Sequence, residues 1–121
     1  MADWPDTLPG LNIKQALTQL GGKKALLLRL LGMFTDNHSE DVNRLLAAAS
    51  SQDSKAVFEI NHALKGVTAN LAADELCQLC VDLDSKLKNE ESNIETELTA
   101  MPLAMETLLS SIQAASQLSA D

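Results

Sequence analysis

Apolar residues recur at steps of three and four through most of the chain, and this spacing limits its fold more than any other feature. Residues so spaced share one face of an α-helix, and the helix has to bury that face. The pattern runs through long stretches at about residues 23–50, 54–71, 74–89 and 92–118, and through a shorter one at 12–20. Glycines and short polar stretches separate them. The spacing predicts helices and no strands.

The composition agrees with a helical fold. Of the 121 residues, 45% are hydrophobic but only 2% are aromatic, a balance that suits helix packing better than sheet packing. Short connections between long helices make sequence neighbours antiparallel. We therefore expect an all-α protein, an antiparallel up-and-down four-helix bundle with a short additional N-terminal helix. Residues 1–10 would form a lead-in and residues 11–119 a single domain, long enough for its own core.

Short polar residues mark the expected helix starts. Asn12, Asp53 or its neighbours, and Asp74 are predicted N-caps, because their side chains accept hydrogen bonds from free backbone N–H groups. Pro102 removes a backbone donor from the last segment, which predicts either a kink or a restart of the helix there; both options stay open. Prolines and a glycine exclude a helix from the lead-in, where Trp4 is expected on the bundle surface.

The net charge of -8 limits the possible partners. Nucleic acids and anionic lipid surfaces bind cationic proteins, so neither is expected here. No apolar run reaches the roughly 18 residues that span a bilayer, and the N-terminal residues lack the basic and apolar regions of a signal peptide. We expect a cytoplasmic protein without membrane insertion.

Cys77 and Cys80 have the spacing of a redox pair or of half a zinc site. On a helix, however, the same spacing places both on one apolar face, and no second pair or nearby histidine completes a tetrahedral site. Buried, reduced core cysteines are the favoured interpretation. No metal site is expected.

His62 falls on the outer side of the helix predicted at 54–71. A helical wheel places these residues on the opposite, inward side: Val57, Ile60, Leu64, Val67 and Leu71. The stripe around His62 is unusual for a solvated surface, because it carries the apolar ring of Phe58 and the small residues Gly66 and Ala69. A glycine within a helix costs about 1 kcal/mol relative to alanine, so we expect a partner to approach the backbone there.

Lys65 lies one turn beyond His62 and would bring an ammonium group near an anion held on the imidazole. An ordinary surface lysine is the competing interpretation. The other histidine, His38, falls near the inward side of its helix, between Phe34 and Val42, where a packed or partly buried role is expected. His62 is therefore the candidate for surface chemistry.

Residues 62–71 (HALKGVTANL) closely resemble the signature of bacterial histidine-phosphotransfer (HPt) domains, His-x-Leu-Lys-Gly followed by small residues and Asn-Leu-Gly. A weaker similarity extends over about residues 8–88. The resemblance implies a phosphoacceptor at His62, phosphate neutralisation by Lys65, and steric access for a receiver domain at Gly66. Phe58 and Ala69 would belong to the docking patch.

In many members of the family a polar or acidic residue on the adjacent helix orients the imidazole, and the matching position is Asp84. A solvated role for Asp84 remains the alternative. Ala72 departs from the family pattern, which has glycine there, and this leaves the helix ending open. Asn70 is expected near the helix end without a catalytic role.

The resemblance implies a phosphorelay intermediate that passes phosphate between receiver-domain aspartates of a hybrid sensor kinase and a response regulator. No Gly-rich phosphate loop is present, so the chain is not expected to be an enzyme with its own ATP site. It would be a monomer without a cofactor of its own, with Mg²⁺ held by the partner receiver.

Two other functions fit the sequence less well. The phosphoacceptor part of a histidine kinase usually has a carboxylate directly after its histidine, where this chain has Ala63. A non-transferring adaptor would not need the imidazole. The sequence leaves open whether the domain is free-standing or part of a hybrid kinase.

Overall fold

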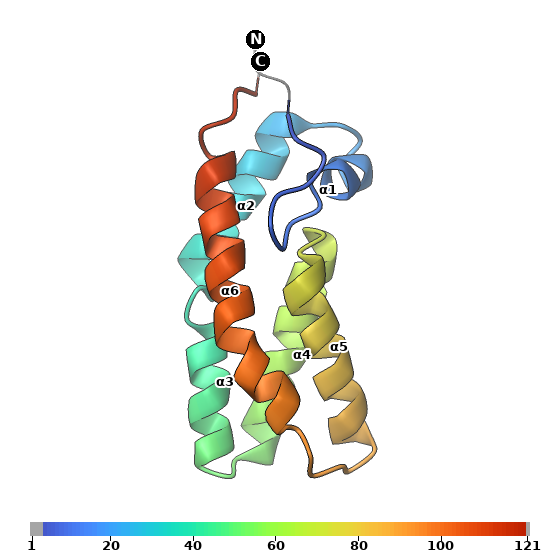
Figure 1. Cartoon of the computed structure of the whole chain (residues 1–121), viewed down its shortest axis with the longest axis vertical. Helices are drawn as coiled ribbons and strands as arrows, with labels where there is room; N and C mark the ends of the chain where they lie inside the picture. Colours follow the sequence, from blue (N-terminus) through green and yellow to red (C-terminus); the bar gives the residue numbers. More distant parts are fainter. Residues whose placement is uncertain (1–3, 121) are drawn as a thin grey trace.

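The computed structural model describes residues 4–120, and all the regular structure in that range is helical. The helices are α1 (Ile13–Gln19), α2 (Lys24–His38), α3 (Asp41–Ser50), α4 (Ser54–Asn70), α5 (Asp74–Lys88) and α6 (Glu95–Ala115). Figure 1 shows four long columns of helix, with α1 lying across one end. The predicted all-α class and helical bundle are confirmed.

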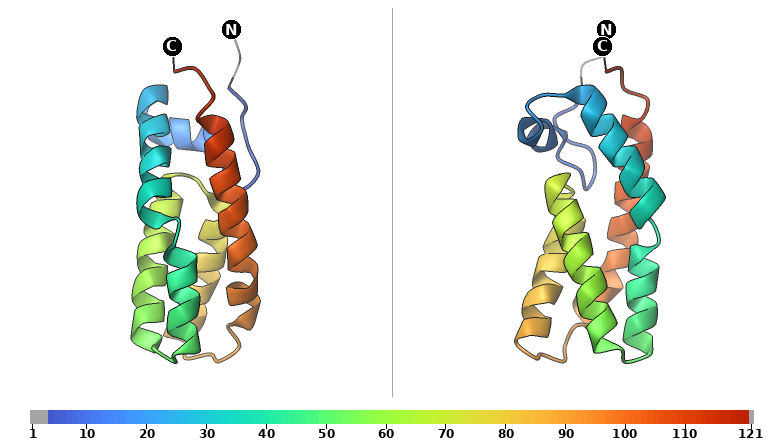
Figure 2. Two further views of the ribbon diagram at one scale, coloured as in Figure 1. Left: turned by 90° about the vertical axis from the view of Figure 1, so that its left-hand side faces the viewer. Right: turned by 180° about the vertical axis from the view of Figure 1, so that it is seen from behind.

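Helices α2 and α3 follow one another in a single column of the bundle (Figure 2). Helix α4 packs against α3 and α5, while α6 packs against α5 on one side and against α2 and α3 on the other. The outer face of α4 is therefore remote from α6. This arrangement leaves one side of α4 uncovered along the length of the bundle.

The column of α2 and α3 corrects the prediction of one unbroken helix over residues 23–50. Helix α2 ends at His38, and α3 starts at Asp41 after a turn at Ser39 and Glu40. The Asp41 carboxylate accepts hydrogen bonds from Nδ1 of His38 at 2.7 Å and from Arg44 at 3.2 Å. Short polar residues compete with the helical backbone for hydrogen bonds, which favours a break at this point.

Two of the three predicted N-caps are confirmed. Asn12 accepts a hydrogen bond from the backbone of Gln15 at 3.0 Å, and Asp53 accepts one from Ala56 at 3.1 Å. Asp74 was wrongly predicted as a cap, because it is the first residue of α5.

The N-cap of α5 is Ala73, which makes no side-chain capping bond. The tight turn before it places Ala72 at φ 54° and buries Ala72 and Ala73 in the core. Ala72 thus occupies a left-handed conformation that glycine adopts without strain, at the position where the sequence departs from the HPt pattern.

Helix α6 continues through Pro102, so the helix does not restart there. The proline is exposed, and Met101 and Ala104 on either side of it are buried. The missing N–H costs one hydrogen bond within the helix, while the packing of the remaining turns keeps α6 in one piece.

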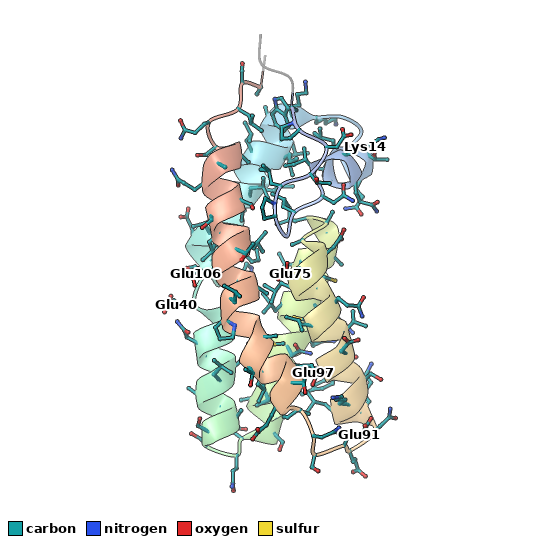
Figure 3. The ribbon with its side chains drawn as sticks, in the orientation of Figure 1. Lys14, Glu40, Glu75, Glu91, Glu97 and Glu106 are labelled. Atoms are coloured by element: carbon teal, nitrogen blue, oxygen red, sulfur yellow. The ribbon has the colours of Figure 1, made fainter. Side chains whose placement is uncertain are left out.

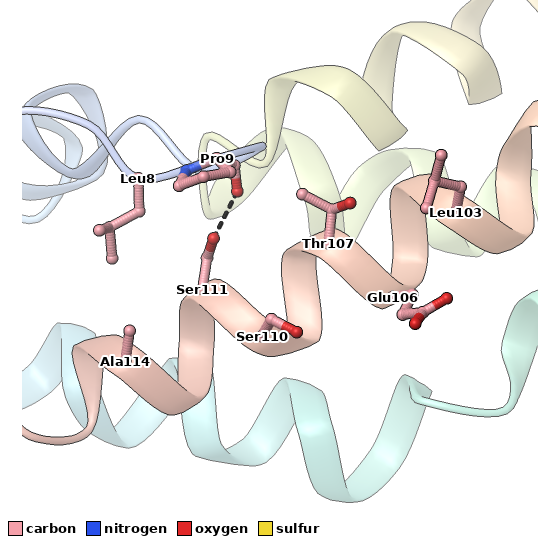
Figure 4. A pocket seen from close by; sticks show the side chains of 8 residues that line it. All are labelled: Leu8, Pro9, Leu103, Glu106, Thr107, Ser110, Ser111 and Ala114. Atoms are coloured by element: carbon pink, nitrogen blue, oxygen red, sulfur yellow. Dashed lines mark hydrogen bonds between the residues drawn. The ribbon is translucent and has the colours of Figure 1, made fainter.

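The lead-in is fixed to the bundle. Pro9 accepts a hydrogen bond from the Ser111 hydroxyl of α6 (Figure 4), and Leu8 and Leu11 pair through their backbones. Trp4 is half-buried, and its indole N–H donates to the Ser119 carbonyl at 2.7 Å. The two ends of the described chain are thereby joined at one end of the bundle.

Leucine is the commonest residue of the core and provides eight of its twelve largest fully buried side chains. Charged side chains such as those of Glu40, Glu75 and Glu106 lie at the outside (Figure 3). Among the described residues, no helix has both the length and the apolar character to cross a membrane.

Burial of the apolar helix faces provides the main stabilisation. The largest fully buried side chains are Phe34, Leu11, Ile13, Leu27, Leu31, Leu45, Leu64, Leu76, Leu83, Met101, Leu108 and Val42.

Candidate functional site

Helix α4 buries one face and leaves His62 on the other. Val57, Leu64 and Leu71 are buried, as the wheel predicts, and Ile60 and Val67 are partly buried against the core. The buried face also includes two polar residues that the apolar pattern does not reveal, Asn61 and Thr68. Thr68 donates to the Leu64 carbonyl, while Asn61 donates to the Cys80 carbonyl and leaves its Oδ1 without a partner in the described chain.

The imidazole of His62 is exposed and lies parallel to the half-buried ring of Phe58, with 5.8 Å between ring centroids and 13° between planes. Helical side chains lean toward the N-terminus, which brings residues four apart into contact. Within residues 4–120, the His62 ring makes no hydrogen bond or ion pair. Both ring nitrogens are therefore open to a partner.

Lys65 does not reach toward His62 in this structure. Its Nζ lies 3.0 Å from Oδ2 of Asp84, across the contact between α4 and α5. Lys88 places its own Nζ 3.0 Å from the same oxygen. The side chains of Lys65, Asp84 and Lys88 are 25%, 7% and 59% exposed. One buried carboxylate thus joins two cations beside the His62 face.

The predicted contact between Asp84 and His62 is absent among the hydrogen bonds of the described residues. One oxygen of Asp84 is taken by the lysines, while Oδ1 is buried and has no partner. Burial by itself would raise the pKa of Asp84, but hydrogen bonds from Lys88 and Lys65 and their positive charges lower it below its ordinary value. The carboxylate is therefore charged at neutral pH.

Gly66 is exposed, and a Cβ added there would meet no atom within 4 Å beyond its two chain neighbours and the nearby backbone of α4. The packing of this fold therefore does not require glycine at the position. Ala69 is also exposed, and the side chain of Gln19 in α1 donates to the backbone carbonyls of Ala69 and Asn70 at the end of α4. The surface beyond His62 is lined by small side chains.

The two cysteines lie against the same pair of helices. Cys77 is half-buried, and its thiol donates to the Lys65 carbonyl at 3.8 Å. Cys80 is buried, and desolvation together with the neighbouring Cys77 raises the pKa of its thiol to about 12. Both are free thiols. In the described part of the chain, no group of three or more His, Cys, Asp or Glu side chains is arranged to hold a metal ion.

Sequence reasoning missed Lys88. An aspartate followed by a lysine four residues later is a helical pair that the sequence does show. Only the fold reveals that Lys65 joins the same carboxylate. His38, in contrast, is half-buried as predicted.

Hollows elsewhere on the molecule do not coincide with this site. A hollow of about 350 Å³ lies between the lead-in and the outer side of α6 (Figure 4), and His62 does not line it. His62 instead stands on an open helix face. The fold and the site together define a class: a helical bundle with an exposed histidine on an open helix face, one turn from a lysine and beside small residues.

Comparison with known proteins identifies the family. Residues 29–116 match the model of the Hpt domain, so the chain belongs to the Hpt domain family. The fold is similar to that of the HPT domain of a sensor hybrid histidine kinase from Shewanella, with a TM-score of 0.84 and 28% sequence identity over 93% of this chain and 99% of that one. No curated protein matches the chain. Hpt domains are phosphotransfer modules of phosphorelays rather than kinases, and they pair with receiver domains.

Proposed function

We propose that His62 carries the phosphoryl group and passes it between an aspartate in the receiver domain of a hybrid sensor kinase and one in the receiver of a response regulator. The observation that carries this proposal is the exposed imidazole on α4, free of hydrogen bonds within the described chain and one turn from Lys65. His38 does not fit the role as well, because it is half-buried, whereas His62 is exposed on an open helix face.

The reaction is a reversible in-line transfer. The lone pair of Nε2 of neutral His62 attacks the phosphorus of an aspartyl phosphate, and an N–P bond forms as the P–O bond breaks. The aspartate leaves with the electron pair of that bond, and the imidazole retains the proton on Nδ1. Positioning and charge neutralisation supply the catalysis, with Mg²⁺ held by the receiver.

In this proposal, Lys65 neutralises the phosphoryl group. Its side chain is one turn from His62, and a unit charge pair at about 4 Å gains about 4 kcal/mol at an effective dielectric of about 20 before desolvation. To reach the phosphoryl group, the ammonium has to turn away from Asp84, which holds it at 3.0 Å.

Asp84 remains the candidate for orienting the imidazole. Its unpaired Oδ1 is able to accept a hydrogen bond from Nδ1–H, which would leave Nε2 directed outward. Such a contact requires the His62 ring to turn from its stacked position on Phe58.

The receiver would dock on the stripe of α4 formed by Phe58, His62, Gly66 and Ala69. The open space at Gly66 supports this assignment, because the fold itself gives no reason for a glycine there. Phe58 offers an apolar ring beside the reacting nitrogen. We expect the chain to act as a monomer and in the cytoplasm.

Phosphoryl transfer from a receiver domain charged with acetyl phosphate tests the proposal. The wild-type chain should acquire acid-labile phosphate, and the His62→Gln variant should acquire none. His38→Gln serves as the matched control and should be labelled normally. A folded wild-type chain that takes no label from cognate receivers would favour the adaptor interpretation instead.

A further inference from the structure

Asp84 binds two cations through a single oxygen. Lys65 reaches Oδ2 from α4 and Lys88 reaches it from the next turn of α5, each at 3.0 Å. The residue is only 5% exposed, and its other oxygen has no partner. The carboxylate therefore has one more cation than its charge requires.

A buried carboxylate is costly to leave without a cation, because neither water nor protein then compensates its charge. If Lys65 were its single partner, moving Lys65 away would leave the Asp84 carboxylate without a cation and would incur this cost. Lys88 avoids this cost, because it lies four residues from Asp84 on the same helix. Its ion pair with the carboxylate therefore does not depend on Lys65 or on α4.

A phosphoryl group on His62 changes the competition for Lys65. It places about two negative charges one turn from Lys65, against the single charge of Asp84. Lys65 is then attracted away from α5 toward the phosphate. The free energy of that movement includes the cost of leaving the Asp84 carboxylate with one cation fewer.

We propose that Lys88 is a positioning residue for phosphotransfer: it keeps Asp84 neutralised while Lys65 moves to the phosphoryl group. This inference rests on the proposed function of His62. Lys88 acts through Asp84 and Lys65 and does not itself touch the phosphate. Its side chain is 59% exposed and needs no rearrangement to remain on Asp84.

A double-mutant cycle tests the coupling. The phosphorylation equilibrium between a phosphorylated receiver and this chain would be measured for wild type, Lys88→Met, Asp84→Asn and the double variant. Lys88→Met should shift the equilibrium toward the receiver by about three- to tenfold, the range for a partly exposed ion pair. The same change in the Asp84→Asn background should have no effect, because no carboxylate then competes for Lys65.

Matched variants separate this role from others. Lys88→Arg should restore the equilibrium, and Lys23→Met, which removes one exposed positive charge at the start of α2, should leave it unchanged. Urea unfolding checks that every variant is folded.

Wild-type behaviour of Lys88→Met overturns the inference on Lys88 but not the role of His62. An equal loss in both backgrounds also overturns it, because Lys88 would then act on the phosphate directly. A wild type without label overturns both proposals.

Discussion

The two histidines of this chain have a similar local sequence arrangement but lie in different environments. Each follows a phenylalanine by four residues and lies against its ring. The centroids are 5.5 Å apart and the planes tilted by 31° for Phe34 and His38, against 5.8 Å and a stacked 13° for Phe58 and His62. His38 is half-buried and bonded to Asp41, while His62 is exposed and without a bond in the described chain. An aromatic neighbour therefore does not decide whether a histidine is exposed and free of hydrogen bonds.

The residue three positions later produces the difference. After His38 this residue is Asp41, whose carboxylate accepts from Nδ1 at 2.7 Å and fixes the ring at the break between α2 and α3. After His62 it is Lys65, whose ammonium donates to the Asp84 carboxylate at 3.0 Å and leaves the His62 ring without a bond within residues 4–120. His38 is thus bonded within the fold, whereas His62 is exposed and unbonded in the described chain.

The largest expected effect is on phosphoryl transfer when each of the two histidines is replaced. His62→Gln should lower phosphoryl transfer by at least about a hundredfold, because the nucleophile is lost. His38→Gln should change the rate little. Rates of labelling by a phosphorylated receiver measure both, and strong loss in the His38 variant would reverse the comparison.

The two phenylalanines should separate stability from transfer. Phe34 is 1% exposed, and Phe34→Ala should destabilise the fold by about 3–5 kcal/mol through loss of buried surface and a cavity. Phe58→Ala should cost about 1 kcal/mol, because the ring is half-buried, yet it should slow transfer. Urea unfolding and transfer assays distinguish the outcomes. Wild-type transfer by Phe58→Ala with every receiver would remove Phe58 from the docking patch.

Two exposed helical glycines allow a matched test of partner access. A Cβ at either Gly32 or Gly66 meets no atom within 4 Å beyond its chain neighbours and the nearby backbone of its own helix. Gly32→Gln and Gly66→Gln should each stabilise the helix by up to about 0.5 kcal/mol. Only Gly66→Gln should also slow transfer, by about tenfold, because its side chain occupies the space beside His62. Equal transfer by both variants would contradict a docking role for Gly66.

The smallest effect is a pH dependence at Asp84. Its pKa is lowered in the folded protein, so its contribution to stability is present above the unfolded pKa and is lost as the pH falls through the folded pKa. Asp84→Asn should therefore cost about 1 kcal/mol at pH 7, and the gap to wild type should narrow below about pH 4. Urea midpoints at both pH values measure this. A constant gap would show that packing, rather than charge, stabilises the site.

The sequence by itself determined the class of fold and the exposed histidine. Three- and four-residue spacing is a property of single helices, so it predicted the buried face of α4 and the position of His62 opposite to it. Asn12 and Asp53 cap through bonds to residues three positions away, which are also local. Residues 62–71 carried enough of the HPt signature to indicate the family.

Tertiary structure decided what lies between helices. The break between α2 and α3 at Ser39 and Glu40 was not predicted, because the apolar spacing is continuous through it. The bonds of Asp41 to His38 and Arg44 there are local, but apolar spacing does not reveal them. The pairing of Lys65 with Asp84 joins residues 19 positions apart and follows from the packing of α4 on α5. Local patterns fix which face of a helix is buried, but only the assembled bundle determines which charges meet beside His62.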